Sequence, residues 1–221
     1  MSGSKYECPV CGGHFRALLP YGVKGRSNAL CPKCLSLERH RLIWLYLKAK
    51  TDFFTAPKKM LHIAPEQAFY KVFKKLNNLN YVTADLESPL ADIKLDIKAM
   101  PLENESFDVV MCNHVLEHID DDRLAMSEVY RVLRKGGFAI LQVPMQDMPE
   151  TYEDATITEP LEREKHFLQK DHVRIYGRDY GKRLRSVGFE VIEDDFVKHI
   201  DATLLAKYCL PVDEIIYFCE K

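Results

Sequence analysis

The sequence predicts an α/β fold with a mostly parallel sheet, preceded by a small metal-binding ribbon. Predicted strands alternate with predicted helices of ten or more residues, which is typical of a parallel sheet covered on both faces. Two Cys-x2-Cys pairs stand within the first 35 residues. The chain has 221 residues, of which 47% are hydrophobic, so it is long enough to build a core without disulfides.

The four N-terminal cysteines predict a zinc ribbon over residues 1–35. Cys8 and Cys11 form one pair, Cys31 and Cys34 form the other, and 19 residues separate the pairs. Two thiolates from each pair converge on one ion at about 2.3 Å, and two pairs complete a tetrahedron. Because four thiolates leave no open coordination position, we expect the Zn²⁺ to be structural. An iron–sulfur centre and metal-free thiols are the alternatives.

A second domain is predicted over residues 36–221. It begins with a helix over 36–50, which Ser36 is expected to cap. Further strands are expected over residues 59–64, 80–84, 93–95, 107–112, 138–143, 190–197 and 214–218, with helices over 66–76, 120–134 and 178–187. Gly136 and Gly137 are expected to end the helix over 120–134.

Residues 145–176 break this alternation. The segment is rich in charges and follows a predicted central strand. Open α/β sheets bind ligands at the carboxyl ends of their strands. We therefore predict that this segment is an insertion that covers the substrate.

Acidic residues end two successive predicted strands, at Asp85 and Asp96. A carboxylate at the first position can accept both hydroxyl groups of a ribose, and one at the second can accept from an adenine amino group. The turn after the first strand contains Pro65 and Glu66 and no glycine. A pyrophosphate needs free N–H donors there, so NAD, FAD and nucleoside triphosphates are disfavoured. The pattern favours a neutral or cationic nucleoside.

A family resemblance runs through residues 58–145. Its motifs are Ala84-Asp85-Leu86, Leu95-Asp96-Ile97, Met100-Pro101-Leu102, Ser106-Phe107-Asp108-Val109-Val110-Met111-Cys112-Asn113-His114-Val115-Leu116-Glu117-His118-Ile119, Arg131-Val132-Leu133-Arg134-Lys135-Gly136-Gly137 and Leu141-Gln142-Val143-Pro144. In order and spacing these resemble the class I S-adenosylmethionine-dependent methyltransferases, in the group related to ubiquinone- and menaquinone-biosynthesis enzymes. The resemblance implies a Rossmann-like seven-stranded sheet whose last strand is antiparallel, and S-adenosylmethionine and S-adenosylhomocysteine as ligands.

The resemblance also implies where the cofactor binds. Asp85 would hold the ribose, Asp96 and Ile97 would flank the adenine, and Asn113 and His114 would lie beside the methionyl part. The first turn departs from the glycine-rich pattern of the family, so its glycines are not carried over, and Glu66 is a candidate partner of the α-ammonium group. The residues expected to contact the cofactor are Ile63, Ala64, Pro65, Glu66, Asp85, Leu86, Asp96, Ile97, Asn113 and His114.

Methyl transfer from a sulfonium needs chiefly proximity and alignment, and it needs a base only if the acceptor loses a proton. The candidate catalytic residues are His114, His118, His172 and Tyr176, with Glu117 and His166 as further candidate bases. The residues expected to contact the substrate are His166, His172, Arg174 and Tyr176. No cysteine or carboxylate stands at a third position that fits His114 and His118, so a second metal site is not expected.

Three functions remain open from the sequence. The first is a methyltransferase acting on a small molecule. The second is an RNA methyltransferase whose ribbon contacts RNA, since residues 1–35 contain five basic residues and one acidic residue. The near balance of 31 basic and 33 acidic residues argues against it. The third is a non-catalytic scaffold that binds S-adenosylmethionine, which the glycine-free turn favours.

The chain is expected to be cytoplasmic and to have no membrane partner. The first five residues contain no apolar signal core, and no apolar run reaches the ~18 residues of a membrane span. The oligomeric state stays open.

Overall fold

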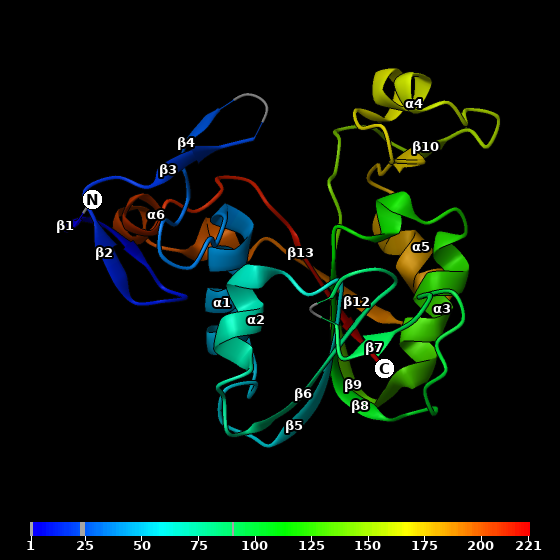
Figure 1. Ribbon diagram of the computed structural model, residues 1–221, viewed down its shortest axis with the longest axis horizontal. Coiled ribbons are helices and arrows are strands. Elements are labelled where there is room, and N and C mark those ends of the chain that lie inside the picture. The colour runs from blue at the N-terminus through cyan, green and yellow to red at the C-terminus, as the bar shows by residue number, and fades with distance from the viewer. Residues whose placement is uncertain (1, 23–24, 90) are drawn as a thin grey trace. The chain divides into compact units, whose positions relative to one another are not determined.

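The computed structural model describes residues 2–22, 25–89 and 91–221, and it confirms the α/β architecture (Figure 1). A seven-stranded sheet has the order β12–β13–β9–β8–β5–β6–β7. The strands are β5 (Lys58–Ile63), β6 (Leu79–Asp85), β7 (Ile93–Lys94), β8 (Phe107–Asn113), β9 (Leu133–Gln142), β12 (Glu190–Asp194) and β13 (Ile216–Glu220). β8 runs parallel to β5 and β9, whereas β13 is antiparallel to β9. The expected sheet and its antiparallel last strand are therefore confirmed.

The central strands are buried almost throughout. β8 is buried at every position except Asp108, and β9 is buried from Gly137 to Gln142. Continuous burial is typical of parallel strands that are covered on both faces. Because β5 and β8 are parallel, their carboxyl ends meet at one edge of the sheet, where ligands of such sheets bind.

The chain divides into two compact units, and the first comprises residues 1–58, 65–81 and 194–216. It contains the ribbon strands β1 (Ser2–Cys8), β2 (Gly13–Phe15), β3 (Leu19–Tyr21) and β4 (Arg26–Leu30), and the helices α1 (Glu38–Lys50), α2 (Gln67–Phe73) and α6 (Ala202–Tyr208). β1 pairs with β2 and β3 with β4, both antiparallel. Aromatic rings join two segments of this unit, 1–58 and 65–81: Trp44 of α1 stacks on Phe73 of α2 at a centroid distance of 6.1 Å. The predicted boundary between residues 35 and 36 stays a prediction.

The second unit comprises residues 59–64, 82–193 and 217–221. Besides the sheet it contains the short 3-10 turn η1 (Leu116–His118) and the helices α3 (Asp122–Val132) and α5 (Tyr180–Ser186). Within residues 145–176 lie β10 (Tyr152–Glu153), α4 (Pro160–Phe167) and β11 (Arg174–Ile175), and β10 pairs with β11. The predicted insertion thus has its own small framework.

Two predicted helix ends are wrong. α1 begins at Glu38 with Leu37 as its N-cap, because the Ser36 hydroxyl contacts thiols instead of capping the helix. The helix that was expected to reach residue 134 is α3, which ends at Val132, and β9 begins at the next residue, Leu133. Its glycines lie inside the strand, at an irregularity where Phe107 pairs with Leu133 but Val109 pairs with Phe138.

None of the helices in the described part of the chain has the length and apolar character needed to cross a membrane.

Candidate functional site

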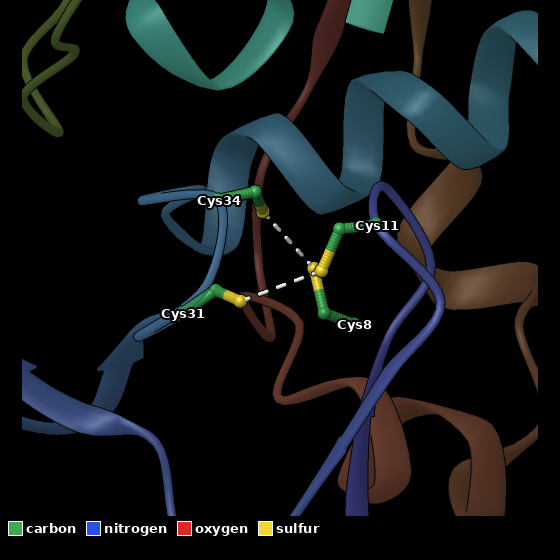
Figure 2. A group of neighbouring side chains, drawn as sticks. All are labelled: Cys8, Cys11, Cys31 and Cys34. Atoms are coloured by element: carbon green, nitrogen blue, oxygen red, sulfur yellow. Dashed lines mark hydrogen bonds between the residues drawn. The ribbon is translucent and has the colours of Figure 1, made fainter. Parts of the chain in front are cut away.

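The four N-terminal thiols converge on one point (Figure 2). The sulfur atoms of Cys8 and Cys34 are 3.6 Å apart, and those of Cys11 and Cys31 are 3.8 Å apart. All four sulfurs lie within 4.8 Å of one another, and none is in a disulfide. Sulfurs placed tetrahedrally at about 2.3 Å from a zinc ion are about 3.8 Å apart. The donor set predicted from the sequence therefore fits Zn²⁺ in both chemistry and spacing.

The backbone and a nearby hydroxyl support this cluster. The Gly12 N–H donates to the Cys8 carbonyl at 2.8 Å, and Gly12 has a φ of 63°, which closes the first turn tightly. The Ser36 hydroxyl lies 3.1 Å from the sulfur of Cys8 and 3.2 Å from that of Cys34. Burial and the neighbouring Cys8 raise the pKa of Cys11 to about 11. A divalent cation would offset the repulsion between such crowded thiolates.

Arg41 is a supporting residue that the sequence analysis missed. Its side chain is wholly buried, and burial lowers its pKa while the nearby Cys8 thiol acts in the opposite direction. The guanidinium donates to the backbone carbonyls of Asn28, Ala29, Ser36, Tyr208 and Cys209. A positive charge that interacts with Cys8 and Cys31 balances part of the negative charge of a zinc–thiolate centre. The available signal was an arginine within the apolar period of the predicted helix.

At the sheet edge, the backbone turns sharply after β5 and β8. Ala64 and His114 both adopt left-handed conformations, with φ of 50° and 54°. The N–H of Ala64 donates to the Ala84 carbonyl, and that of His114 donates to the Gln142 carbonyl, both at 2.8 Å. Non-glycine residues rarely adopt this conformation, and such strain is concentrated at functional sites.

Asp85 ends β6, and Asp96 lies two residues beyond the end of the neighbouring strand β7. Ala84 pairs with Ile93, and the Leu95 N–H donates to the Asp85 carbonyl at 3.1 Å, so Asp85 and Asp96 lie at one edge. The Oδ1 atom of Asp85 accepts the N–H groups of Glu87 and Ser88, at 2.8 and 2.7 Å.

The Oδ1 atom of Asp96 accepts the Lys98 N–H at 2.8 Å. In both acids these backbone bonds engage one carboxylate oxygen and fix the orientation of the side chain. Leu86 is exposed and Ile97 is buried. Asn113, also buried, is the last residue of β8.

Glu66 has protein partners of its own. Its carboxylate lies 2.5 Å from Nε2 of His40 and accepts from Arg39 at 3.2 Å. These contacts hold the start of α2 against α1 within the first unit. The structure thus gives Glu66 a structural role, and the contact predicted with an α-ammonium group stays a prediction.

Several candidate side chains gather just after β8. The imidazole of His114 lies 3.4 Å from the Glu117 carboxylate, and Glu117, His118 and His172 offer ligand atoms within 4.8 Å of one another. The rings of His118 and His172 are 4.7 Å apart and almost perpendicular. Burial, together with the nearby His118, lowers the pKa of His172. The fold therefore brings together three of the four predicted catalytic residues.

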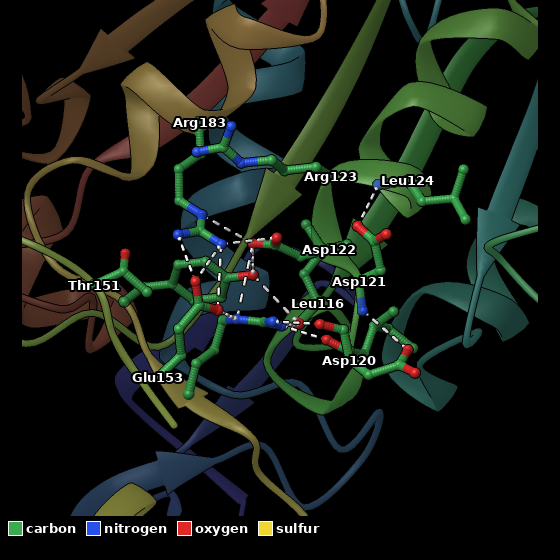
Figure 3. A network of polar contacts seen from close by, with 12 residues as sticks. Leu116, Asp120, Asp121, Asp122, Arg123, Leu124, Thr151, Glu153 and Arg183 are labelled. Carbon is green, nitrogen blue, oxygen red and sulfur yellow. Dashed lines mark hydrogen bonds and ion pairs between the residues drawn. The ribbon is translucent and has the colours of Figure 1, made fainter. Parts of the chain in front are cut away.

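Figure 3 shows the polar network around Asp122, to which Arg183 and Glu153 belong. The fourth predicted residue, Tyr176, joins this buried network through its hydroxyl. Its hydroxyl donates to Asp122 at 2.7 Å, and Arg183 donates to both oxygens of the same carboxylate, at 2.8 and 3.0 Å. Burial and the charge of Asp122 raise the pKa of Tyr176 well above its ordinary value. A buried, protonated tyrosine that donates to a carboxylate is poorly suited to accept a proton.

Arg174 is likewise engaged inside the protein. It is 3% exposed and donates to Glu153 at 2.9 Å. It also donates to the backbone carbonyls of Leu116, Ile119 and Asp120. These bonds give Arg174 a structural role in holding the loop after β8.

His166 stands apart from these residues. It is exposed, and its ring contacts the hydroxyl of Tyr152 at 3.0 Å. The structure does not bring it into the group around Glu117. Its predicted contact with the substrate stays a prediction.

Part of the chain is similar to a known domain family. The family described as a methyltransferase domain matches residues 51–141. An uncharacterized 37.1 kDa protein in transposon TN4556 of Streptomyces fradiae is 33% identical over 107 residues, which are 47% of this chain and 30% of that protein. The match therefore spans under a third of that curated relative.

Solved structures show the same fold. An S-adenosylmethionine-dependent methyltransferase from Mesorhizobium loti has a TM-score of 0.55 at 16% identity, covering 80% of this chain and 97% of its own. The cyclase SpnF has a TM-score of 0.57 at 16% identity, covering 95% of this chain and 88% of its own. The fold is thus that of the class I S-adenosylmethionine-dependent methyltransferases.

Proposed function

We propose that this chain, with its methyltransferase domain over residues 51–141, is an S-adenosylmethionine-dependent methyltransferase that acts on a small molecule. The observation that carries the proposal is the pair of carboxylates, Asp85 at the end of β6 and Asp96 two residues beyond the end of the neighbouring strand β7. We further propose that the four-cysteine cluster holds a structural zinc ion.

The residues fit a nucleoside with no phosphate. Asp85 and Asp96 present oxygen acceptors to hydroxyl and amino groups, and the backbone bonds to Oδ1 hold both side chains in place. Pro65 has no N–H to offer a phosphate. Asn113 and His114, which end β8, would meet the amino-acid part of the cofactor.

Bound S-adenosylmethionine supplies a methyl group on a sulfonium sulfur, which is already an activated leaving group. The task of the chain is then to align the acceptor and exclude water. For an acceptor that must lose a proton, His114 is the best placed base, because its side chain is 29% exposed and lies beside the sheet edge. The small-molecule acceptor is supported by the net charge of −2, which offers no overall attraction to a polyanion.

The decisive test is the affinity for S-adenosylmethionine of the variant Asp85→Asn. Asparagine keeps an oxygen for the N–H groups of Glu87 and Ser88, so the loop is preserved, but the charge that holds a ribose is lost. Loss of a charged hydrogen bond of about 1.5–3 kcal/mol weakens binding by roughly tenfold or more. Calorimetric titration measures this.

The matched control is Glu87→Gln, which removes an exposed acid from the same loop and should leave the affinity unchanged. If the unaltered chain binds no S-adenosylmethionine at millimolar concentration, or if Asp85→Asn binds it equally well, the proposal is wrong.

A further inference from the structure

A second set of metal-ligand side chains lies apart from the cysteines. Glu117 and His118 belong to η1, which follows β8, and His172 lies near the end of the insertion. One ligand atom of each lies within 4.8 Å of the other two. We propose that these residues form a second metal site, which takes a first-row divalent cation such as Zn²⁺, Co²⁺ or Mn²⁺.

The carboxylate of Glu117 is the strongest argument. Its side chain is only 2% exposed, and Oε1 lies 3.4 Å from Nδ1 of His114. Among the described residues, Oε2 is buried and has no hydrogen-bond partner. Leaving such an oxygen unsatisfied costs roughly 1–3 kcal/mol or more, and a buried carboxylate oxygen without a hydrogen-bond partner calls for a ligand. A cation bound at this oxygen removes the penalty.

The two histidines are arranged as metal ligands commonly are. Nδ1 of His118 lies 3.2 Å from the carboxylate and 3.3 Å from the carbonyl oxygen of Asp171. Donation from Nδ1 to these oxygens makes Nε2 the lone-pair nitrogen, and this outer contact is typical of histidines that bind metals. His172 is buried, with 5% exposure, and faces the other ring at 4.7 Å.

The geometry requires only a small closure. Ligand atoms at about 2.1 Å from one ion are about 3–3.5 Å apart, so side-chain shifts of about one ångström bring the three together. His118 can make such a shift because a third of its side chain is exposed. Two imidazoles and a carboxylate suit first-row divalent ions and leave coordination positions open.

The open positions indicate what the site would bind. They are available to water or to an oxygen atom of a bound molecule, and the site follows His114 directly along the chain. An acceptor bearing a hydroxyl group would gain from this, because a bound cation lowers the pKa of a coordinated hydroxyl. This extension to the acceptor rests on the proposed function, whereas the metal site itself does not.

The test is a titration of the full chain with Co²⁺ after the cysteine cluster has been loaded with Zn²⁺ and excess metal removed. We expect one equivalent of Co²⁺ to bind without displacing zinc and without sulfur-to-cobalt charge-transfer absorption. In Glu117→Gln and His118→Asn the Co²⁺ affinity should fall at least about tenfold. Glutamine preserves the size of Glu117, and the partial exposure of His118 makes its substitution tolerable for folding.

The control is His199→Asn, which removes an exposed histidine whose ring contacts Asp195, four residues earlier, at 3.0 Å. This variant should bind Co²⁺ unchanged. Co²⁺ uptake only by exchange with zinc would overturn the proposal, as would an unchanged affinity in both variants. Neither measurement involves S-adenosylmethionine. A failure of the proposed metal site can therefore be distinguished from a failure of the proposed function.

Discussion

At the scale of single residues, Ala64 shows how a methyltransferase fold is built without glycine in its first turn. The backbone there has a φ of 50°, a conformation that glycine adopts freely and alanine does not. The sequence shows that this turn contains no glycine. It does not reveal the strained backbone at Ala64, because the φ angle there depends on the whole connection from β5 to α2. The turn keeps its shape through the bond from the Ala64 N–H to the Ala84 carbonyl.

We therefore expect Ala64→Gly to stabilise the protein by up to about 1 kcal/mol, since the left-handed strain of about 1–2 kcal/mol outweighs the larger entropy of an unfolded glycine. Urea unfolding measures the difference. Ala99→Gly, at an exposed position without a positive φ, serves as the control and should lower stability by a few tenths of a kcal/mol. A stability of Ala64→Gly below that of the unaltered chain would show that the turn is not strained.

At the scale of elements, the ribbon strands are too small to hold themselves together. β1 to β4 form two separate two-stranded sheets, and their buried cluster contains Val10, Phe15 and Leu18 besides two cysteines. Isolated hairpins are marginally stable in water. The ion that the four thiols fit would supply the missing stability.

Zinc removal should therefore unfold the ribbon before the sheet. Once excess metal has been removed, we expect one tightly bound zinc per chain and loss of that zinc after Cys34→Ser. In that variant or after chelation, amide-exchange protection should be lost across residues 2–22 and 25–30, as measured by hydrogen exchange. Cys209→Ser changes a thiol outside the cluster and should retain the metal. Full protection of the ribbon in metal-free protein would contradict this role.

The helix α3 and the insertion are linked by the carboxylate of Asp122. Burial opposes its charge, but the bonds from Arg183 and the charge of Arg174 outweigh burial and lower its pKa. Because the folded-state pKa is lowered, this carboxylate stabilises the fold above its unfolded value of about 4, and the contribution is lost as the pH falls through the folded value. Asp122→Asn leaves buried Arg183 with a weaker partner and should cost about 3 kcal/mol at neutral pH.

Urea unfolding at several pH values tests this expectation. The deficit of Asp122→Asn should shrink as the pH falls below about 4. Asp121→Asn is the matched control, because Asp121 caps α3 by accepting the Leu124 N–H and asparagine caps equally well. A deficit that is constant with pH would mean that the charge of Asp122 does not contribute.

At the scale of the whole molecule, the sequence predicted what depends on local pattern. The strands that form β5, β8 and β9 were found because parallel strands buried on both faces are continuous apolar runs. The link from Arg41 to the Tyr208 carbonyl was missed because it joins residues far apart in the chain. The approach of His172 to Glu117 and His118 was missed for the same reason. A second metal site was therefore not expected from the sequence.

The charge of the molecule bears on the choice between a small acceptor and RNA. Two basic residues of the ribbon already have partners within the protein. Arg26 pairs with Glu38 at 3.0 Å, and Lys33 donates to the Cys11 carbonyl at 3.3 Å. Lys24 lies outside the described residues. This leaves Lys5 and Arg16 as the exposed basic side chains that remain on the described part of the ribbon.

We accordingly expect retention of a stem-loop RNA to be weak and almost independent of salt. Each neutralised phosphate contributes about −0.7 to −0.9 to the slope of log affinity against log salt concentration, so a slope near zero means that few phosphates are contacted. Filter retention between about 50 and 200 mM salt measures the slope. A slope of about −3 or steeper would contradict the small-molecule acceptor. If that slope became flatter in Arg16→Gln, the RNA contact would be assigned to the ribbon, because this substitution removes one charge and leaves the cysteine cluster intact.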